Sequence, residues 1–109
     1  MTINTTTVLK DYEGKDIITE DKPFTVRTVL LNALQYQSQE LAPSAEQSVR
    51  AYSLSMAVAN TPQVQLKSDD IVYIKARLLK LYTPLVFGQM VELLEGEKLE
   101  APAEDEKPE

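Results

Sequence analysis

Few side chains in this chain of 109 residues could carry out catalysis, and their types and spacing do not favour it. The chain contains no His and no Cys. The commonest general base, Cys nucleophiles, disulfides and thiolate zinc sites are therefore excluded. Asp69 and Asp70 are adjacent carboxylates, but adjacent helical residues point about 100° apart and do not converge on one ion. We interpret both as residues that favour a helix start, where the helix dipole attracts negative charge.

The remaining polar clusters are equally weak as sites. Glu92 and Glu95 would share a helix face, but no further ligand accompanies them. Four basic residues between 67 and 80 could bind nucleic acid, yet the pI of about 4.7 argues against a phosphate-binding surface. The three glycines are too dispersed for a phosphate loop, and no Ser has a base at a recognisable spacing. We therefore expect no enzymatic activity, no cofactor, no metal site and no nucleic-acid partner.

The composition is typical of a single globular domain. Hydrophobic residues make up 43% of the chain and charged residues 26%, both ordinary fractions for a protein with one core. No stretch approaches the ~18 apolar residues of a membrane-spanning helix. The start of the chain shows no secretory signal pattern. These observations predict a cytoplasmic protein without a membrane partner.

Most of the net charge of −6 lies near the C-terminus. Residues 97–109 contain six acids and two Lys, a net charge of −4, whereas residues 1–96 contain eleven acids and nine bases, a net charge of −2. The segment 97–109 also lacks an apolar period, so we predict a disordered acidic tail. Residues 1–5 are polar and expected to be disordered too. One globular domain over residues 6–96 remains.

The first part of this domain reads as β structure. Residues 6–19 predict a hairpin in which Gly14 supplies the positive φ of the turn. An isolated hairpin is marginal in water, so it must pack on helices or gain a third strand. Residues 63–67 alternate apolar and polar side chains and could form that strand. Residues 20–23 are interpreted as a polar connector.

Two helices are predicted between these β segments. The first follows Thr25 as N-cap and ends before Pro43. The second follows a capping box formed by Ser44 and Gln47 and runs to about residue 59. Its predicted buried residues are Val49, Tyr52, Met56 and Ala59.

Two further helices contain the densest apolar sequence. The third helix is expected to start with Ser68 as N-cap and to bury a stripe that includes Ile74 and Leu78. Pro84 fits the first turn of a fourth helix, which Gly96 would end. The predicted class is therefore α+β, with the order ββααβαα. A four-helix bundle with a loose N-terminus is the alternative.

Several segments resemble small acidic proteins encoded by tailed bacteriophages and prophages. The segments are Leu9-Lys10-Asp11 with Gly14-Lys15, Asp70-Ile71 with Ile74-Lys75, and Tyr82-Thr83-Pro84-Leu85-Val86-Phe87-Gly88-Gln89 with Leu93-Leu94-Glu95. Such proteins have no established function, so the resemblance transfers no site residues. It implies a bacterial host cytoplasm, during phage infection or in a lysogen.

The leading functional hypothesis is a non-catalytic module that binds a phage or host protein. Its expected contact residues are Phe87, Gly88 and Met90, because the fourth helix is apolar on more than one side. A tail or capsid assembly chaperone is one alternative, and an acidic DNA mimic is another. Self-association into a homo-oligomer is left open.

Overall fold

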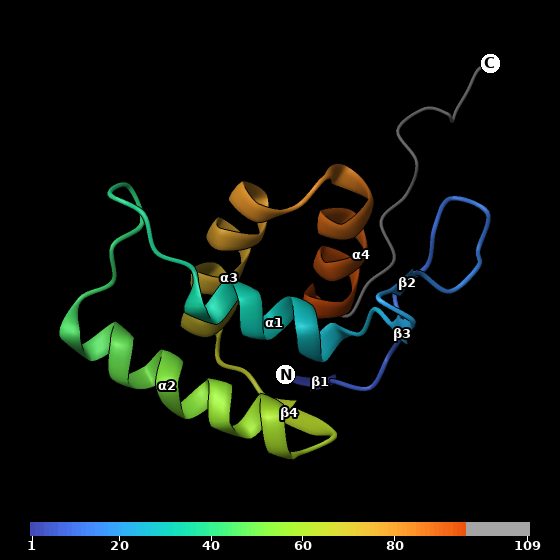
Figure 1. Ribbon diagram of the computed structural model, residues 1–109. Coiled ribbons are helices and arrows are strands. Elements are labelled where there is room, and N and C mark those ends of the chain that lie inside the picture. Colours follow the sequence, from blue (N-terminus) through green and yellow to red (C-terminus); the bar gives the residue numbers. More distant parts are fainter. Residues whose placement is uncertain (96–109) are drawn as a thin grey trace.

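The structure is a computed structural model that describes residues 1–95 (Figure 1). It confirms the predicted α+β class and order, with one more short strand before the first helix. The elements are β1 (Thr2–Asn4), β2 (Ile18–Thr19), β3 (Lys22–Pro23), α1 (Val26–Gln35), α2 (Ala45–Asn60), β4 (Gln63–Gln65), α3 (Ser68–Leu81) and α4 (Pro84–Glu95). Gly96 and the predicted acidic tail lie outside the described residues. None of the described helices is long and apolar enough to cross a membrane.

The N-terminal segment is ordered, which corrects the expectation that residues 1–5 are disordered. β1 pairs antiparallel with β4, so that Ile3 lies opposite Val64. Both side chains are buried. The Met1 ammonium donates to the Leu66 carbonyl at 2.8 Å, and the Leu66 N–H donates to the Met1 carbonyl at 2.7 Å. Ile3 is the one apolar residue of β1, and strand alternation points its side chain into the core.

The predicted hairpin is present: the Ile17 N–H donates to the Leu9 carbonyl at 2.9 Å, and the Asp11 N–H donates to the Lys15 carbonyl at 2.8 Å. Gly14 has a φ of +83° inside a loop closed by the bridge between Lys10 and Asp16. β2 then pairs with β3 in a second hairpin. Its turn is made by Glu20 and Asp21, whose φ values are 49° and 64°. The expected polar connector is therefore a tight turn, and β4 joins β1 instead of the hairpin.

Helix α1 lies between α2 on one side and α3 on the other (Figure 1). Thr25 is its N-cap, as predicted, and accepts a hydrogen bond from the Thr28 N–H. The helix ends at Gln35, earlier than expected, and the chain leaves it through an extended Tyr36. Five α1 side chains are buried: Val26, Val29, Leu30, Ala33 and Leu34.

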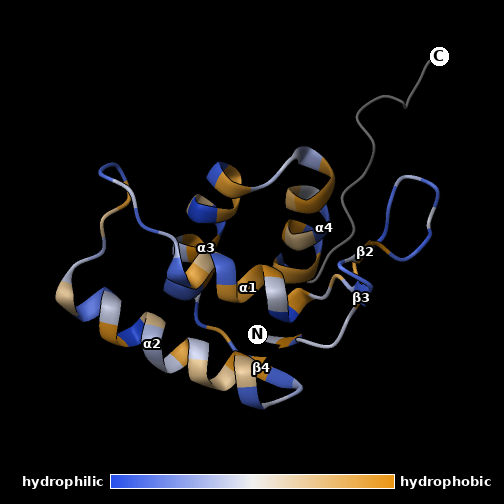
Figure 2. Cartoon of the chain, viewed as in Figure 1, coloured by the Kyte–Doolittle hydropathy of each residue, from blue (hydrophilic) through white to orange (hydrophobic). Residues whose placement is uncertain are grey.

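Helices α3 and α4 complete the core. Ile74 and Leu78 of α3 and Met90 and Leu94 of α4 are buried against α1 and the β segments. Figure 2 shows hydrophobic residues, coloured orange, along α1, α3 and α4. Pro84 starts α4 as predicted. Ser68, however, is the first helical residue of α3 and not its N-cap, which is Lys67.

Candidate protein-interaction surface

Helix α2 has a well-defined start. The Ser44 hydroxyl accepts a hydrogen bond from the Gln47 N–H at 3.1 Å, and the Gln47 carboxamide accepts one from the Ser44 N–H at 3.0 Å. This reciprocal pair is the predicted capping box. It satisfies donors that a helix end otherwise leaves to water, and it sets where α2 begins.

The other end of α2 is held by a side chain from α1. The Arg27 guanidinium donates through Nε to the Val58 carbonyl at 2.8 Å and through Nη2 to the Thr61 carbonyl at 3.1 Å. The Val58 carbonyl lies in the last turn of α2, where a helix leaves carbonyls without an internal donor, and Thr61 is the C-cap residue. A cation at a helix C-terminus is also favoured by the helix dipole. Arg27 therefore ties the end of α2 to α1.

A third contact joins α2 to α3 and fixes the rotation of α2. Arg50 binds Asp70 with two hydrogen bonds, Nε to Oδ1 at 3.0 Å and Nη2 to Oδ2 at 2.7 Å. The Asp70 carboxylate is 5% exposed and also accepts from the Lys67 N–H at 2.9 Å. The hydrogen bonds from Arg50 and the Lys67 N–H outweigh burial and lower the pKa of Asp70. The pKa of Arg50 is raised by the same pair.

With α2 held in this way, its inner face is narrow. Ala51, Leu54, Ser55 and Val58 are buried, and the Gln35 amide donates to the Ser55 hydroxyl at 3.0 Å. The residues predicted to be buried point the other way. Exposed fractions are 67% for Val49, 65% for Tyr52 and 50% for Met56, and Ala45 and Ala59 are exposed as well.

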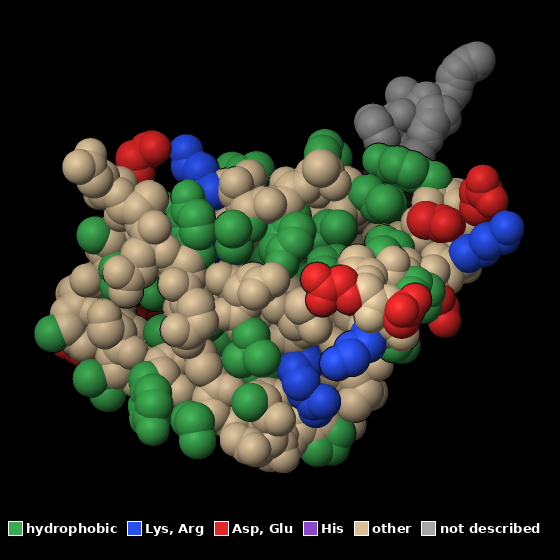
Figure 3. All heavy atoms as spheres, viewed as in Figure 1, with side chains coloured by type: hydrophobic (Ala, Val, Ile, Leu, Met, Phe, Trp, Pro, Cys, Tyr) green, Lys and Arg blue, Asp and Glu red, His purple; other side chains and the backbone are tan. Residues whose placement is uncertain are grey.

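We call Ala45, Val49, Tyr52, Met56 and Ala59 the α2 outer face. Successive members are four, three, four and three residues apart, so at 100° per residue they cover an arc of about 80°. This spacing is also that of the contact positions of paired helices. Figure 3 shows hydrophobic side chains along the lower left margin of the molecule, where Figure 1 places α2. The prediction that Val49, Tyr52, Met56 and Ala59 are buried is therefore wrong, because the opposite stripe of α2 packs on α1.

A cleft of about 1200 Å³ lies beside the outer face, between α2 and α3. Val49 lines it from α2 and Val72 from α3, and Val72 is 68% exposed. Arg77 also lines the cleft but is committed elsewhere. It donates to the carbonyls of Tyr36, Tyr73 and Leu41 at 3.3, 3.2 and 2.6 Å. The cleft therefore adds Val72 to the apolar surface, beside the charged residues Glu46, Lys67 and Asp69 that also line it.

The contact residues predicted on α4 are less accessible. Met90 has no exposed area and belongs to the core, so it cannot touch a partner in this conformation. Phe87 is half-buried and packs against the core. Gly88 is half-buried, and a Cβ added there would meet nothing within 4 Å. Contact of Phe87 and Gly88 with a partner stays a prediction.

The charged residues considered in the sequence do not gather into a site. Lys75 pairs with Glu95 at 2.9 Å, and Lys80 with Glu40 at 3.4 Å. Within residues 1–95, no group of three or more His, Cys, Asp or Glu side chains could hold a metal ion. The Arg50–Asp70 pair was the contact that sequence reasoning missed, since nothing local links residues twenty positions apart.

Comparison with models of known families, with curated proteins and with solved structures finds no match. The function must therefore be argued from the surface itself.

Proposed function

We propose that this protein is a non-catalytic interaction module that binds another protein through the α2 outer face. The observation that carries the proposal is the exposure of Val49, Tyr52 and Met56 on one stripe of a helix whose other stripe is already packed. Contiguous exposed apolar surface of this kind marks protein contact sites more often than scattered single residues do.

The rigidity of α2 supports this role. The capping box, Arg27 and Arg50 hold the start, end and rotation of the helix. A helix face held in this way loses little conformational freedom on binding, which favours affinity. The expected partner surface is an apolar helix or groove, because an amphipathic helix docks through residues spaced three and four apart.

The cellular setting is proposed from the phage resemblance alone. The segment Tyr82-Thr83-Pro84-Leu85-Val86-Phe87-Gly88-Gln89 carries most of it. It favours action on a phage or host protein in the cytoplasm of an infected bacterium. Phage and host partners are both compatible with the α2 outer face.

A capture experiment with matched variants tests the proposed function. The tagged full chain, Met56→Glu and Tyr12→Glu are each incubated with lysate of phage-infected bacteria. Tyr12 is 84% exposed in the loop before Gly14 and serves as the control. We expect the unmodified full chain and the Tyr12→Glu variant to capture the same partner, which is another protein or another copy of the chain. The Met56→Glu variant should not capture it. Equal retention by all three chains would refute the α2 outer face as the binding surface.

A further inference from the structure

We infer that the α2 outer face binds a second copy of this chain, with the two α2 helices antiparallel about a twofold axis next to Tyr52. The inference rests on the proposed function and names its partner. A twofold contact uses the same patch on both copies, so the patch must be complementary to itself.

The outer face has this property along its length. It reads Ala45, Val49, Tyr52, Met56, Ala59, which in size is small, medium, large, medium, small. Reversing the direction of the helix leaves this order of sizes unchanged. Antiparallel pairing therefore sets Ala45 opposite Ala59 of the second copy, Val49 opposite Met56, and Tyr52 beside its own equivalent.

The charge distribution of α2 also permits self-contact. Its only charged residues are Glu46 and Arg50, and Arg50 is bound to Asp70 of its own chain. Ser48, Ser53 and Asn60 border the outer face, together with Glu46 near the start of the helix. No like charges need to approach within the stripe. The net charge of −6 on each chain opposes the contact, and salt screens this repulsion.

The size of the face sets the expected strength. Sixteen residues give α2 a length of about 24 Å at 1.5 Å per residue. A contact made by one pair of such helices is small, and we expect it to bury no more than the ~1,200 Å² at which specific interfaces begin. Val72, across the cleft from Val49, adds apolar area at the edge. A weak dimer with a dissociation constant on the order of 10 µM is expected.

Sedimentation equilibrium of the full chain over 1–500 µM tests the dimer, with salt at 0.05 and 0.5 M. The chain mass is 12.2 kDa, and we expect the apparent mass to approach twice that value as the protein concentration rises. In 0.5 M salt the dimer should form at a lower protein concentration than in 0.05 M salt. Tyr52→Glu places two carboxylates next to the axis and should raise the dissociation constant at least tenfold. Tyr12→Glu, the matched control, should leave it unchanged. Circular dichroism checks that both variants keep their helices.

Single cysteines test the antiparallel arrangement, because the chain has no Cys of its own. Under mild oxidation, Val49→Cys mixed with Met56→Cys should form a mixed disulfide. Val49→Cys alone should remain largely uncrosslinked, because its two copies are offset by about seven residues, or ~10 Å along the axis. That offset exceeds the ~7 Å Cα separation a disulfide can span.

Three results would overturn the inference. The first is a monomer at every concentration, and the second is a dimer that Tyr52→Glu does not weaken. The third is faster crosslinking of Val49→Cys with itself than with Met56→Cys, which would show parallel helices. None of these results removes the proposed function. A monomeric chain that captures a different protein, and loses this capture in the Met56→Glu variant, would still bind through the α2 outer face.

Discussion

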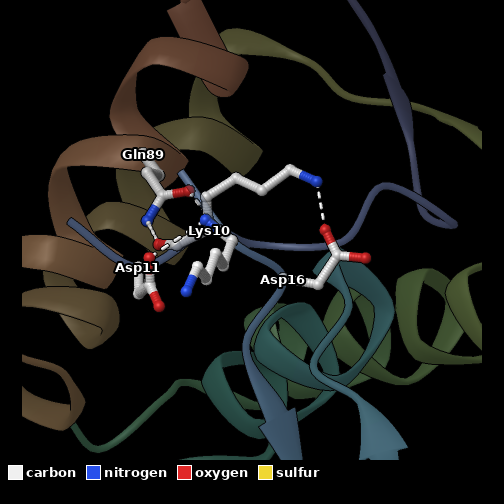
Figure 4. A network of polar contacts seen from close by, with 5 residues as sticks. Lys10, Asp11, Asp16 and Gln89 are labelled. Atoms are coloured by element: carbon white, nitrogen blue, oxygen red, sulfur yellow. Dashed lines mark hydrogen bonds and ion pairs between the residues drawn. The ribbon is translucent and has the colours of Figure 1, made fainter. Parts of the chain in front are cut away.

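The carboxamide of Gln89 pairs with both backbone groups of Lys10, which joins α4 to the loop that precedes β2. The Lys10 N–H donates to Gln89 Oε1 at 2.9 Å, and Gln89 Nε2 donates to the Lys10 carbonyl at 2.7 Å (Figure 4). The side chain thus replaces a strand partner for one residue. Lys10 also pairs with Asp16 across the same loop.

Replacing Gln89 by Ala should destabilise the protein by about 1–2 kcal/mol, because two hydrogen bonds are lost at a partly exposed site. Gln89→Glu keeps the acceptor oxygen but loses the N–H donor, so its free energy of unfolding should lie between those of the wild type and Gln89→Ala. Gln37→Ala, at an exposed position after α1, is the control. Urea unfolding measures the free energy of unfolding of the wild type and of the three variants. A Gln89→Ala value equal to the control would show that the pair contributes nothing.

Stability should decrease at acidic pH because of Asp70. Its pKa is lowered in the folded protein, chiefly by the hydrogen bonds from Arg50. The folded state therefore binds fewer protons than the unfolded state, and this stabilisation is complete above the unfolded pKa of about 3.9. It is lost as the pH falls below that value through the lower folded pKa. Asp70→Asn should cost about 1–2 kcal/mol at pH 7, since Arg50 remains half-exposed and solvated.

Urea unfolding of the wild type and Asp70→Asn between pH 2 and 7 checks this dependence. The difference between the two proteins should be constant from pH 5 to 7 and shrink at lower pH. Asp69→Asn, which changes an exposed neighbour, should retain the wild-type profile. A difference that persists unchanged at pH 2 would contradict the role of Asp70.

Arg77 should be the most sensitive charged residue in the protein. It is 4% exposed and donates to three backbone carbonyls. Its guanidinium carbon also lies 3.5 Å from the centroid of the Tyr73 ring. Arg77→Met should cost about 3 kcal/mol, because the Tyr36 and Leu41 carbonyls lose their donor.

The same variant should loosen the segment between α1 and α2. Limited proteolysis with mass spectrometry should show faster cleavage within residues 36–43 of Arg77→Met. Arg77→Lys should recover only part of the protection, since an ammonium lacks the planar fork of donors. Unchanged cleavage in Arg77→Met would mean that Arg77 does not hold this segment.

Glycines at two positions should respond oppositely to alanine. Gly88 lies inside α4 with open space where a Cβ would be, so Gly88→Ala should stabilise the protein by roughly 0.5–1 kcal/mol through helix propensity. Gly14 has a φ of +83°, so Gly14→Ala should destabilise it by about 1 kcal/mol. Thermal unfolding of both variants measures the two changes in stability relative to the wild type. Destabilisation by Gly88→Ala would contradict the open space that the structure shows beside Gly88.

Sequence reasoning succeeded where the cause is local. The caps at Thr25 and Ser44, the start of α4 at Pro84 and the turn at Gly14 each depend on a residue and its near neighbours. Local hydrogen bonds and backbone preferences decide such features, and they are readable from a few letters. The α+β class followed from the same signals.

Sequence reasoning failed where the local structure depends on a contact with a residue far away in the sequence. Ile3 is ordered because β4 pairs with it. Tyr36 leaves the helix in a segment whose carbonyls bind Arg77 of α3.

The α2 outer face is the clearest example of this division. By itself the sequence determined that α2 is a helix with apolar residues at positions 49, 52 and 56 as well as at 51, 54 and 58. Only the tertiary structure decided which stripe faces α1. The Arg50–Asp70 pair and the small residue Ala51 allow the second stripe to pack. The larger stripe is left exposed, because one helix cannot bury two opposite faces against a single neighbour.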